Sequence, residues 1–125
     1  GASMGGLISF IAAERHPDVF ASAMCMSPAF AYNGFSYVDS LRARAWGGTR
    51  VPVWIDNGTV GLETQLQPGV DDMGTYLDSL QQTFTVRAYR GAKHFESDWG
   101  ARFGEALLWL TTHEPAHPAG RQSAP

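Results

Sequence analysis

The fold of this chain is indicated first by the six residues Val51-Pro52-Val53-Trp54-Ile55-Asp56. Most of these side chains are β-branched or aromatic, and such side chains favour an extended backbone. The proline stands near the start of the run, where a strand best tolerates a missing backbone donor. A short apolar run of this kind is typical of a strand that is buried on both faces of a parallel sheet. We therefore predict a buried central strand over residues 51–56.

Helical and strand patterns are predicted to alternate on both sides of this strand. In chain order the predicted elements are a helix over residues 7–15, a strand over 21–26, a helix over 37–45, the strand over 51–56, a helix over 70–82, a strand over 84–89 and a helix that Ser97 caps. Strands that alternate with helices form a parallel sheet with right-handed crossovers and helices on both faces. The predicted fold class is therefore α/β, with three layers in the order α/β/α. Three strands alone would leave open edges, so this sheet is expected to be part of a larger one.

The remaining segments set the predicted boundaries. Residues 57–69 are predicted to form a polar, glycine-rich loop, and residues 29–36 an aromatic loop. Residues 113–125 contain three prolines and no core-forming side chains, so we predict one domain over residues 1–112 followed by a disordered tail. The last helix is expected to bury the side chains that recur at helical spacing, namely Trp99, Phe103, Leu107 and Leu110.

The composition excludes several classes of protein. Nine basic and twelve acidic side chains give a net charge of −3 without any basic run, so no nucleic-acid partner is expected. No apolar run is long enough to span a membrane, so no membrane partner is expected either. The single cysteine, Cys25, excludes an internal disulfide framework and a cysteine-rich metal site. It fits a cytosolic protein slightly better than a secreted one but does not decide the compartment.

The start of the chain carries a candidate nucleophile. Gly1-Ala2-Ser3-Met4-Gly5 matches the G-x-S-x-G pattern, in which a serine lies on a sharp turn between a strand and a helix. Glycines beside the serine let the strand and the helix approach closely. Ser3 is therefore the candidate nucleophile, and the amide of Met4, at the helix N-terminus, is the candidate oxyanion donor. The alternative is that Gly-Ala-Ser is a cloning remnant ahead of a start at Met4.

His94 is the candidate general base. It stands in a predicted loop between the last strand and the last helix, where an α/β hydrolase carries its catalytic histidine. The alternative is an ordinary surface histidine. Glu96 and Trp99 follow His94 closely and are candidates for holding this loop in place.

An acidic residue after the central strand would complete the chain order serine, acid, histidine. Asp71 and Asp72 fall in the first turn of a predicted helix, where the helix dipole already explains a carboxylate. Glu63 has no such explanation within its predicted loop and is the preferred candidate, while Asp56, Asp71 and Asp72 stay open.

Aromatic residues after the second predicted strand are candidate substrate contacts. Phe30 and Tyr32 lie in a predicted loop at the carboxyl end of the sheet, where α/β proteins bind ligands. The alternative is that these side chains anchor the loop. Cys25 lies within a predicted buried strand and is interpreted as a packing residue.

Four sequence blocks, taken together, suggest a family. The blocks are Gly1-Ala2-Ser3-Met4-Gly5-Gly6, Met26-Ser27-Pro28-Ala29-Phe30, Ile55-Asp56-Asn57-Gly58-Thr59 with Glu63, and Lys93-His94-Phe95-Glu96-Ser97-Asp98-Trp99 with Arg102. Over residues 1 to about 111 the chain resembles the esterase D and enterobactin-esterase-like branch of the α/β hydrolases. The resemblance implies a serine hydrolase of carboxylic esters that acts on a small-molecule ester without a cofactor or metal. It also implies that Ser3 is the nucleophile, Glu63 the acid and His94 the base.

The chain departs from this family in one respect. Such enzymes carry several strands and a second oxyanion-donating loop ahead of the serine, so the chain is expected to be the C-terminal half of one. We expect it to be inactive or impaired by itself, because losing one oxyanion donor lowers turnover about 100- to 1,000-fold. The open sheet edge is expected to allow association with another chain. The alternative function is a non-catalytic α/β interaction module with a vestigial triad, which would bind a partner by strand addition.

Overall fold

The computed structural model of the chain describes residues 1–113, in which helices alternate with strands. The elements are α1 (Met4–Arg15), β1 (Ala23–Met26), β2 (Ala31–Tyr32), β3 (Phe35–Ser36), α2 (Tyr37–Ala43), β4 (Val53–Gly58), α3 (Glu63–Ser79), β5 (Phe84–Tyr89) and α4 (Glu96–Thr112). The order of the main elements is the predicted one. The predicted aromatic loop is a small antiparallel hairpin, because β2 and β3 pair across a two-residue turn.

The three main strands form a parallel sheet in the order β1-β4-β5. Cys25 of β1 lies opposite Ile55 of β4, and Ile55 lies opposite Val86 of β5. All six residues of β4 are buried, as the apolar run of residues 51–56 predicted. The carboxyl ends of parallel strands meet at the same edge of the sheet, so segments that follow β1, β4 and β5 gather there.

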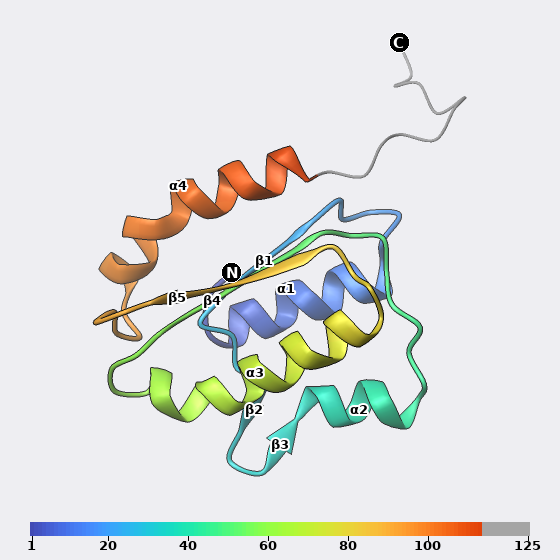
Figure 1. Ribbon diagram of the computed structural model, residues 1–125, viewed down its shortest axis with the longest axis horizontal. Helices are drawn as coiled ribbons and strands as arrows, with labels where there is room; N and C mark the ends of the chain where they lie inside the picture. The colour runs from blue at the N-terminus through green and yellow to red at the C-terminus, as the bar shows by residue number, and fades with distance from the viewer. Residues whose placement is uncertain (114–125) are drawn as a thin grey trace.

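Helices cover both faces of this sheet (Figure 1). The helices α1, α2 and α3 pack on one face, and α4 lies on the other. Along β4 the side chains alternate, because Val53 and Ile55 belong to the core under α1–α3 while Trp54 belongs to the core under α4. This arrangement confirms the predicted three-layer α/β/α fold.

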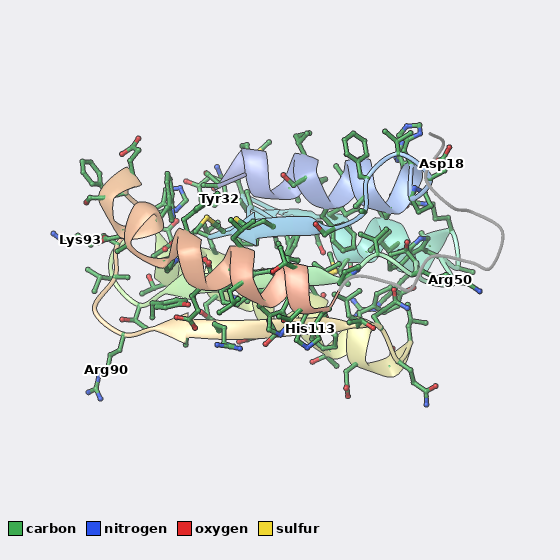
Figure 2. The ribbon with its side chains drawn as sticks, turned by 90° about the horizontal axis from the view of Figure 1, so that it is seen from above. Asp18, Tyr32, Arg50, Arg90, Lys93 and His113 are labelled. Carbon is green, nitrogen blue, oxygen red and sulfur yellow. The ribbon has the colours of Figure 1, made fainter. Side chains whose placement is uncertain are left out.

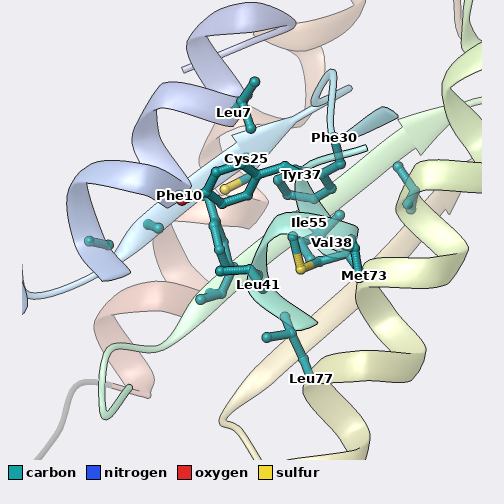
Figure 3. Packing of buried hydrophobic residues seen from close by; sticks show 14 of the residues in the cluster. Leu7, Phe10, Cys25, Phe30, Tyr37, Val38, Leu41, Ile55, Met73 and Leu77 are labelled. Atoms are coloured by element: carbon teal, nitrogen blue, oxygen red, sulfur yellow. The ribbon is translucent and has the colours of Figure 1, made fainter. Parts of the chain in front are cut away.

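The larger core fills the space between the sheet and helices α1–α3 (Figure 3). The ring of Phe10 in α1 meets Phe30 and Tyr37 edge-on, with centroids 5.5 and 6.1 Å apart. Cys25 is fully buried in the same core, and this burial raises the pKa of its thiol to about 12. Cys25 is therefore a packing residue, as predicted.

The helix after β4 begins earlier than the sequence predicted. The prediction of a loop over residues 57–69 is wrong at Asn57 and Gly58, which end β4, and from Glu63 onward, because α3 starts there and continues through Pro68. Proline inside a helix removes a backbone hydrogen bond and normally discourages the helix. Here Leu66 is buried ahead of the proline and Val70 after it, so packing against the sheet outweighs local propensity.

The face that α4 turns to the sheet also differs from the prediction. Phe103 and Leu107 were expected in the core, yet they are 49% and 48% exposed. The buried positions of α4 are Arg102, Ala106 and Leu110. The rotation of α4 differs because Arg102 turns toward the sheet, where it pairs with the buried carboxylate of Asp56.

The start of α4 also differs from the prediction. The helix begins at Glu96 with Phe95 in the N-cap position and no side-chain cap, so the prediction that Ser97 caps it is wrong. Within residues 1–113, no helix is long and apolar enough to cross a membrane. The predicted tail falls, from residue 114 onward, outside the described residues.

Candidate active site

Ser3 lies on a tight turn between the start of the chain and α1. Its backbone has φ 61° and ψ −124°, a conformation that side-chain-bearing residues rarely adopt. Ala2 forms a parallel bridge with Met26 of β1, and the Ser3 amide donates to the Met26 carbonyl at 2.9 Å. The helix starts at once at Met4. The turn from an extended segment into a helix that the G-x-S-x-G pattern predicts is therefore present at Ser3.

The small residues around Ser3 are needed for close packing. A Cβ atom on Gly1 would lie 2.6 Å from the carbonyl oxygen of Gly5. A Cβ atom on Gly6 would lie 3.0 Å from Pro28, in the segment that follows β1. A Cβ atom on Gly5 would meet nothing within 4 Å. A side chain is therefore excluded by close contacts at Gly1, the first glycine of the pattern, and at Gly6, just after it, but not at Gly5.

His94 reaches Ser3 from the loop between β5 and α4. Its Nε2 lies 2.9 Å from Ser3 Oγ, although 91 positions separate the two residues. The loop is held by Asp98, whose carboxylate accepts the Lys93 amide at 2.7 Å. The ring of Trp99 meets the imidazole edge-on, with centroids 4.9 Å apart. Trp99 therefore holds the loop as predicted, but Asp98 rather than Glu96 supplies its polar contact.

Glu63 completes a line of three side chains. Its Oε2 lies 3.0 Å from His94 Nδ1, on the opposite side of the imidazole from Ser3. The Glu63 side chain is completely buried at the start of α3. Its other oxygen, Oε1, accepts the Gly58 amide at 3.1 Å and the Ser27 hydroxyl at 2.5 Å. Ser3, His94 and Glu63 thus meet at the carboxyl edge of the sheet.

The other acidic candidates lie elsewhere. Asp56 is buried at the same edge, but it pairs with Arg102 at 2.8 Å. Asp71 and Asp72 lie in the middle of α3 rather than in a first turn, where Asp71 accepts from Gln67 and Asp72 pairs with Arg42. Of the four acids in the predicted window, Glu63 is the one that contacts His94. The prediction that Glu63 lies within a loop is wrong, however, because Glu63 occupies the first turn of α3.

Comparison with known proteins agrees with this geometry. The profile of a family described as "Putative esterase" matches residues 1–110. The chain belongs to this family. The predicted resemblance to esterases is thereby confirmed. No curated protein matches the sequence significantly.

A solved structure gives an independent comparison for this esterase-family chain. The siderophore hydrolase EstB from Aspergillus nidulans matches with a TM-score of 0.54 and 19% sequence identity. The match covers 99% of this chain and 50% of that chain, so the esterase chain spans about half the length of this relative. At this identity the similarity concerns the fold, and it supports an α/β-hydrolase-like architecture.

The predicted substrate contacts of the esterase chain lie in different surroundings. Phe30 is fully buried against Phe10 in the core, which is the position of a loop anchor. Tyr32 is 42% exposed in the β2–β3 hairpin, toward the same end of the molecule as Lys93 (Figure 2). Binding of substrate by Tyr32 remains a prediction. Met4 is the first residue of α1, and the amide of a first helical residue has no carbonyl partner within its helix.

Sequence reasoning missed the buried polar residues behind Glu63 in this esterase chain. Ser27, which follows β1, bonds to Glu63, and Arg102 of α4 bonds to both Ser27 and Asp56. One available signal was Arg102 itself, the one basic residue of the segment that forms α4. A charge at such a position is almost never fully buried unless it is paired. Within residues 1–113, no group of three or more His, Cys, Asp or Glu side chains is arranged to hold a metal ion.

Proposed function

We propose that this chain carries the catalytic triad of a serine hydrolase that cleaves carboxylic esters, with Ser3 as nucleophile, His94 as base and Glu63 as acid. One observation carries the proposal, namely the continuous line from Ser3 Oγ through both imidazole nitrogens to Glu63 Oε2, with contacts of 2.9 and 3.0 Å. A nucleophile, a base and an orienting carboxylate in this order define the triad on unrelated folds.

The proposed reaction begins with acylation. Ser3 Oγ attacks the ester carbonyl carbon while its proton passes to His94 Nε2. The carbonyl oxygen gains the negative charge of the tetrahedral intermediate, and the amide of Met4 donates to it at the N-terminus of α1. The bond from the carbonyl carbon to the alcohol oxygen then breaks, and His94 returns the proton to the departing alcohol. The product is an acyl ester on Ser3.

Deacylation repeats these steps with water. His94 takes a proton from water as the water oxygen attacks the acyl carbon, and it then protonates Ser3 Oγ as the acid product leaves. Glu63 accepts a hydrogen bond from His94 Nδ1–H throughout, which keeps Nε2 free for Ser3 and stabilises the imidazolium that forms. No cofactor is needed for either half of the reaction.

The substrate is proposed only as a class. The structurally similar EstB is a siderophore hydrolase, so an ester-containing siderophore belongs in the test panel beside simple aryl esters. The family resemblance places a second oxyanion donor ahead of the serine in sequence. We therefore expect residues 1–125 alone to react more slowly than a longer protein, by about 100- to 1,000-fold if one donor is lacking.

Labelling with a fluorophosphonate tests this proposal, because the probe reacts with an activated serine. We expect a label on Ser3 that disappears in Ser3→Ala and His94→Ala. Ser9→Ala is the control, since Ser9 lies on the same helix, where its hydroxyl donates to the Gly5 carbonyl and accepts from the Gly1 amino group. The proposal is wrong if Ser3 stays unlabelled both in this chain and in a longer protein that includes the preceding half.

A further inference from the structure

The carboxylate of Glu63 is held by a buried cluster that the proposed triad does not include. We call Ser27, Asp56, Trp99 and Arg102 the Ser27 cluster. Three of its hydrogen bonds meet at one atom, Ser27 Oγ, which lies 2.5 Å from Glu63 Oε1 and 2.9 Å from both Trp99 Nε1 and Arg102 Nη2. Ser27, Asp56 and Arg102 are all buried.

The chemistry of these groups fixes the direction of each bond. An indole N–H and a guanidinium N–H donate and never accept. Both lone pairs of the Ser27 hydroxyl are therefore taken by Trp99 and Arg102, and its one proton must point to Glu63. Glu63 Oε1 then accepts from the Ser27 hydroxyl and from the Gly58 amide at 3.1 Å. These two bonds fix the rotation of the carboxyl group of Glu63.

This arrangement decides what His94 meets. Because Oε1 is already engaged, the oxygen that faces the imidazole is Oε2, 3.0 Å from Nδ1. An anionic acceptor at that position holds the proton on Nδ1 and leaves Nε2 unprotonated toward Ser3. The tautomer that a general base needs thus depends on the hydroxyl of Ser27, from which Ser3 is separated by Glu63 and His94.

Ser27 is itself held in a demanding position. Its backbone has φ 41°, a region that favours glycine. Its amide donates to both the side chain and the backbone carbonyl of Asp56, at 3.1 and 2.9 Å. Asp56 in turn accepts from Trp54 Nε1 at 2.8 Å and from Arg102 at 2.8 Å. A serine kept in a strained conformation by five polar contacts is not explained by packing alone.

We propose that Ser27, oriented by Trp99 and Arg102, is the positioning residue that fixes the rotation of Glu63 and thereby the tautomer of His94. This inference rests on the proposed function, because the Ser27 hydroxyl is argued to act through Glu63 and His94 of the proposed triad. Trp99 contacts both the proposed triad and the Ser27 cluster, since its ring packs edge-on against His94 while its N–H donates to Ser27 Oγ.

The test combines labelling with a titration of His94. Ser27→Ala removes the hydroxyl, and Ser27→Gly removes it in a residue that suits φ 41°, so the second variant keeps the test valid if the first one folds poorly. Ser9→Ala is the control. The fluorophosphonate reaction at Ser3 is followed against pH, and the titration midpoint of the His94 imidazole is measured by NMR, with His94→Gln for assignment.

We expect both Ser27 variants to label about 10- to 100-fold more slowly, the range seen when outer partners of functional histidines are removed. The charged groups that contact Glu63 are His94 from the loop after β5 and Arg102 from α4, and Asp56 of β4 contacts Arg102. With Glu63 no longer held toward Nδ1, the imidazolium loses stabilisation, so the His94 midpoint moves to lower pH. Trp99→Phe, which keeps a ring beside His94, should shift it less.

The outcomes separate the two proposals. An unchanged labelling rate and an unchanged His94 midpoint in Ser27→Gly would overturn the positioning role while leaving the triad intact. The positioning role would also be overturned if the slower labelling were explained entirely by a smaller fraction of folded protein, with no shift of the His94 midpoint. If wild-type Ser3 fails to label but the midpoint still moves in the Ser27 variants, the proposed function is wrong and the positioning of His94 stands.

Discussion

Ser3 and His94 are 91 positions apart in sequence, yet Ser3 Oγ and His94 Nε2 are 2.9 Å apart in the structure. The contact depends on the parallel sheet, because Ser3 is bonded to the end of β1 and His94 follows the end of β5. With β4 between them, Glu63 enters from the start of α3 and meets the far side of the imidazole. The sheet therefore brings the proposed nucleophile, base and acid together by the register of its strands.

Replacing His94 should abolish the reactivity of Ser3 without unfolding the protein. His94 lies in the loop between β5 and α4 with its side chain 15% exposed, so His94→Gln is expected to fold. Proton transfer by a positioned base contributes about 100- to 10,000-fold to a rate. We expect a loss of this size in hydrolysis of an aryl ester, measured by release of the chromophore. His16→Gln, at the exposed end of α1, is the control and should behave as wild type.

Replacing Glu63 should damage activity more than replacing any other acid of the predicted window. Glu63→Gln keeps the shape of the side chain but removes the charge that holds the proton on His94 Nδ1. The equivalent change in a serine protease triad lowers kcat about 10,000-fold, which sets the upper limit here. Asp71→Asn is the matched control, since Asp71 contacts only Gln67 on the surface of α3. Equal rates for the two variants would show that Glu63 is not the acid.

The sequence predicted the strands and the order of the site well, because these depend on local patterns. The strand predicted over residues 51–56 is β4, which runs two residues further along the chain from Val53 to Gly58, and the G-x-S-x-G pattern forms the strained turn at Ser3. His94 was placed correctly in the loop after β5, since that loop is short and its flanking elements are strongly patterned.

The features that the sequence did not predict all depend on contacts between distant segments. The early start of α3 reflects burial of Leu66 and Glu63 against the sheet, which local propensity around Pro68 opposes. The rotation of α4 reflects the pairing of Arg102 with Asp56, 46 positions away. The role of Ser27 requires three partners from two distant helices, Glu63 of α3 and Trp99 and Arg102 of α4, so no single stretch of sequence contains it.

The ion pair between Arg102 and Asp56 should matter greatly for stability. Both side chains are almost completely buried, and Arg102→Met would leave the Asp56 carboxylate without its cation. Breaking one partner of a buried pair typically costs about 3–5 kcal/mol of unfolding free energy. Arg42→Met removes an exposed pair with Asp72 and should cost about 1 kcal/mol or less. Urea unfolding of the two variants measures the difference, and equal midpoints would contradict it.

Association through the edge of the sheet remains a prediction. β1 pairs with β4 on one side, and on its other side Met24 and Met26 bond to residues 1–3. Helices α1 and α4 pack near this strand from opposite faces and expose apolar side chains such as Ile8 and Leu107. We expect size-exclusion chromatography with light scattering to detect species larger than a monomer. A monomer that persists at high protein concentration would contradict this expectation.

Cys25 should be inert toward thiol reagents as long as the protein is folded. Burial raises the pKa of its thiol to about 12, so at pH 8 almost none of it is the reactive thiolate. The raised value also means that folding favours the protonated thiol, and this contribution to stability is present below the ordinary thiol pKa and is lost as the pH rises toward 12. Reaction with an aromatic disulfide reagent should therefore be slow at pH 8 and become fast in guanidinium chloride. Rapid reaction of the native protein at pH 8, with no loss of helical circular dichroism, would show that Cys25 is accessible and not part of the core.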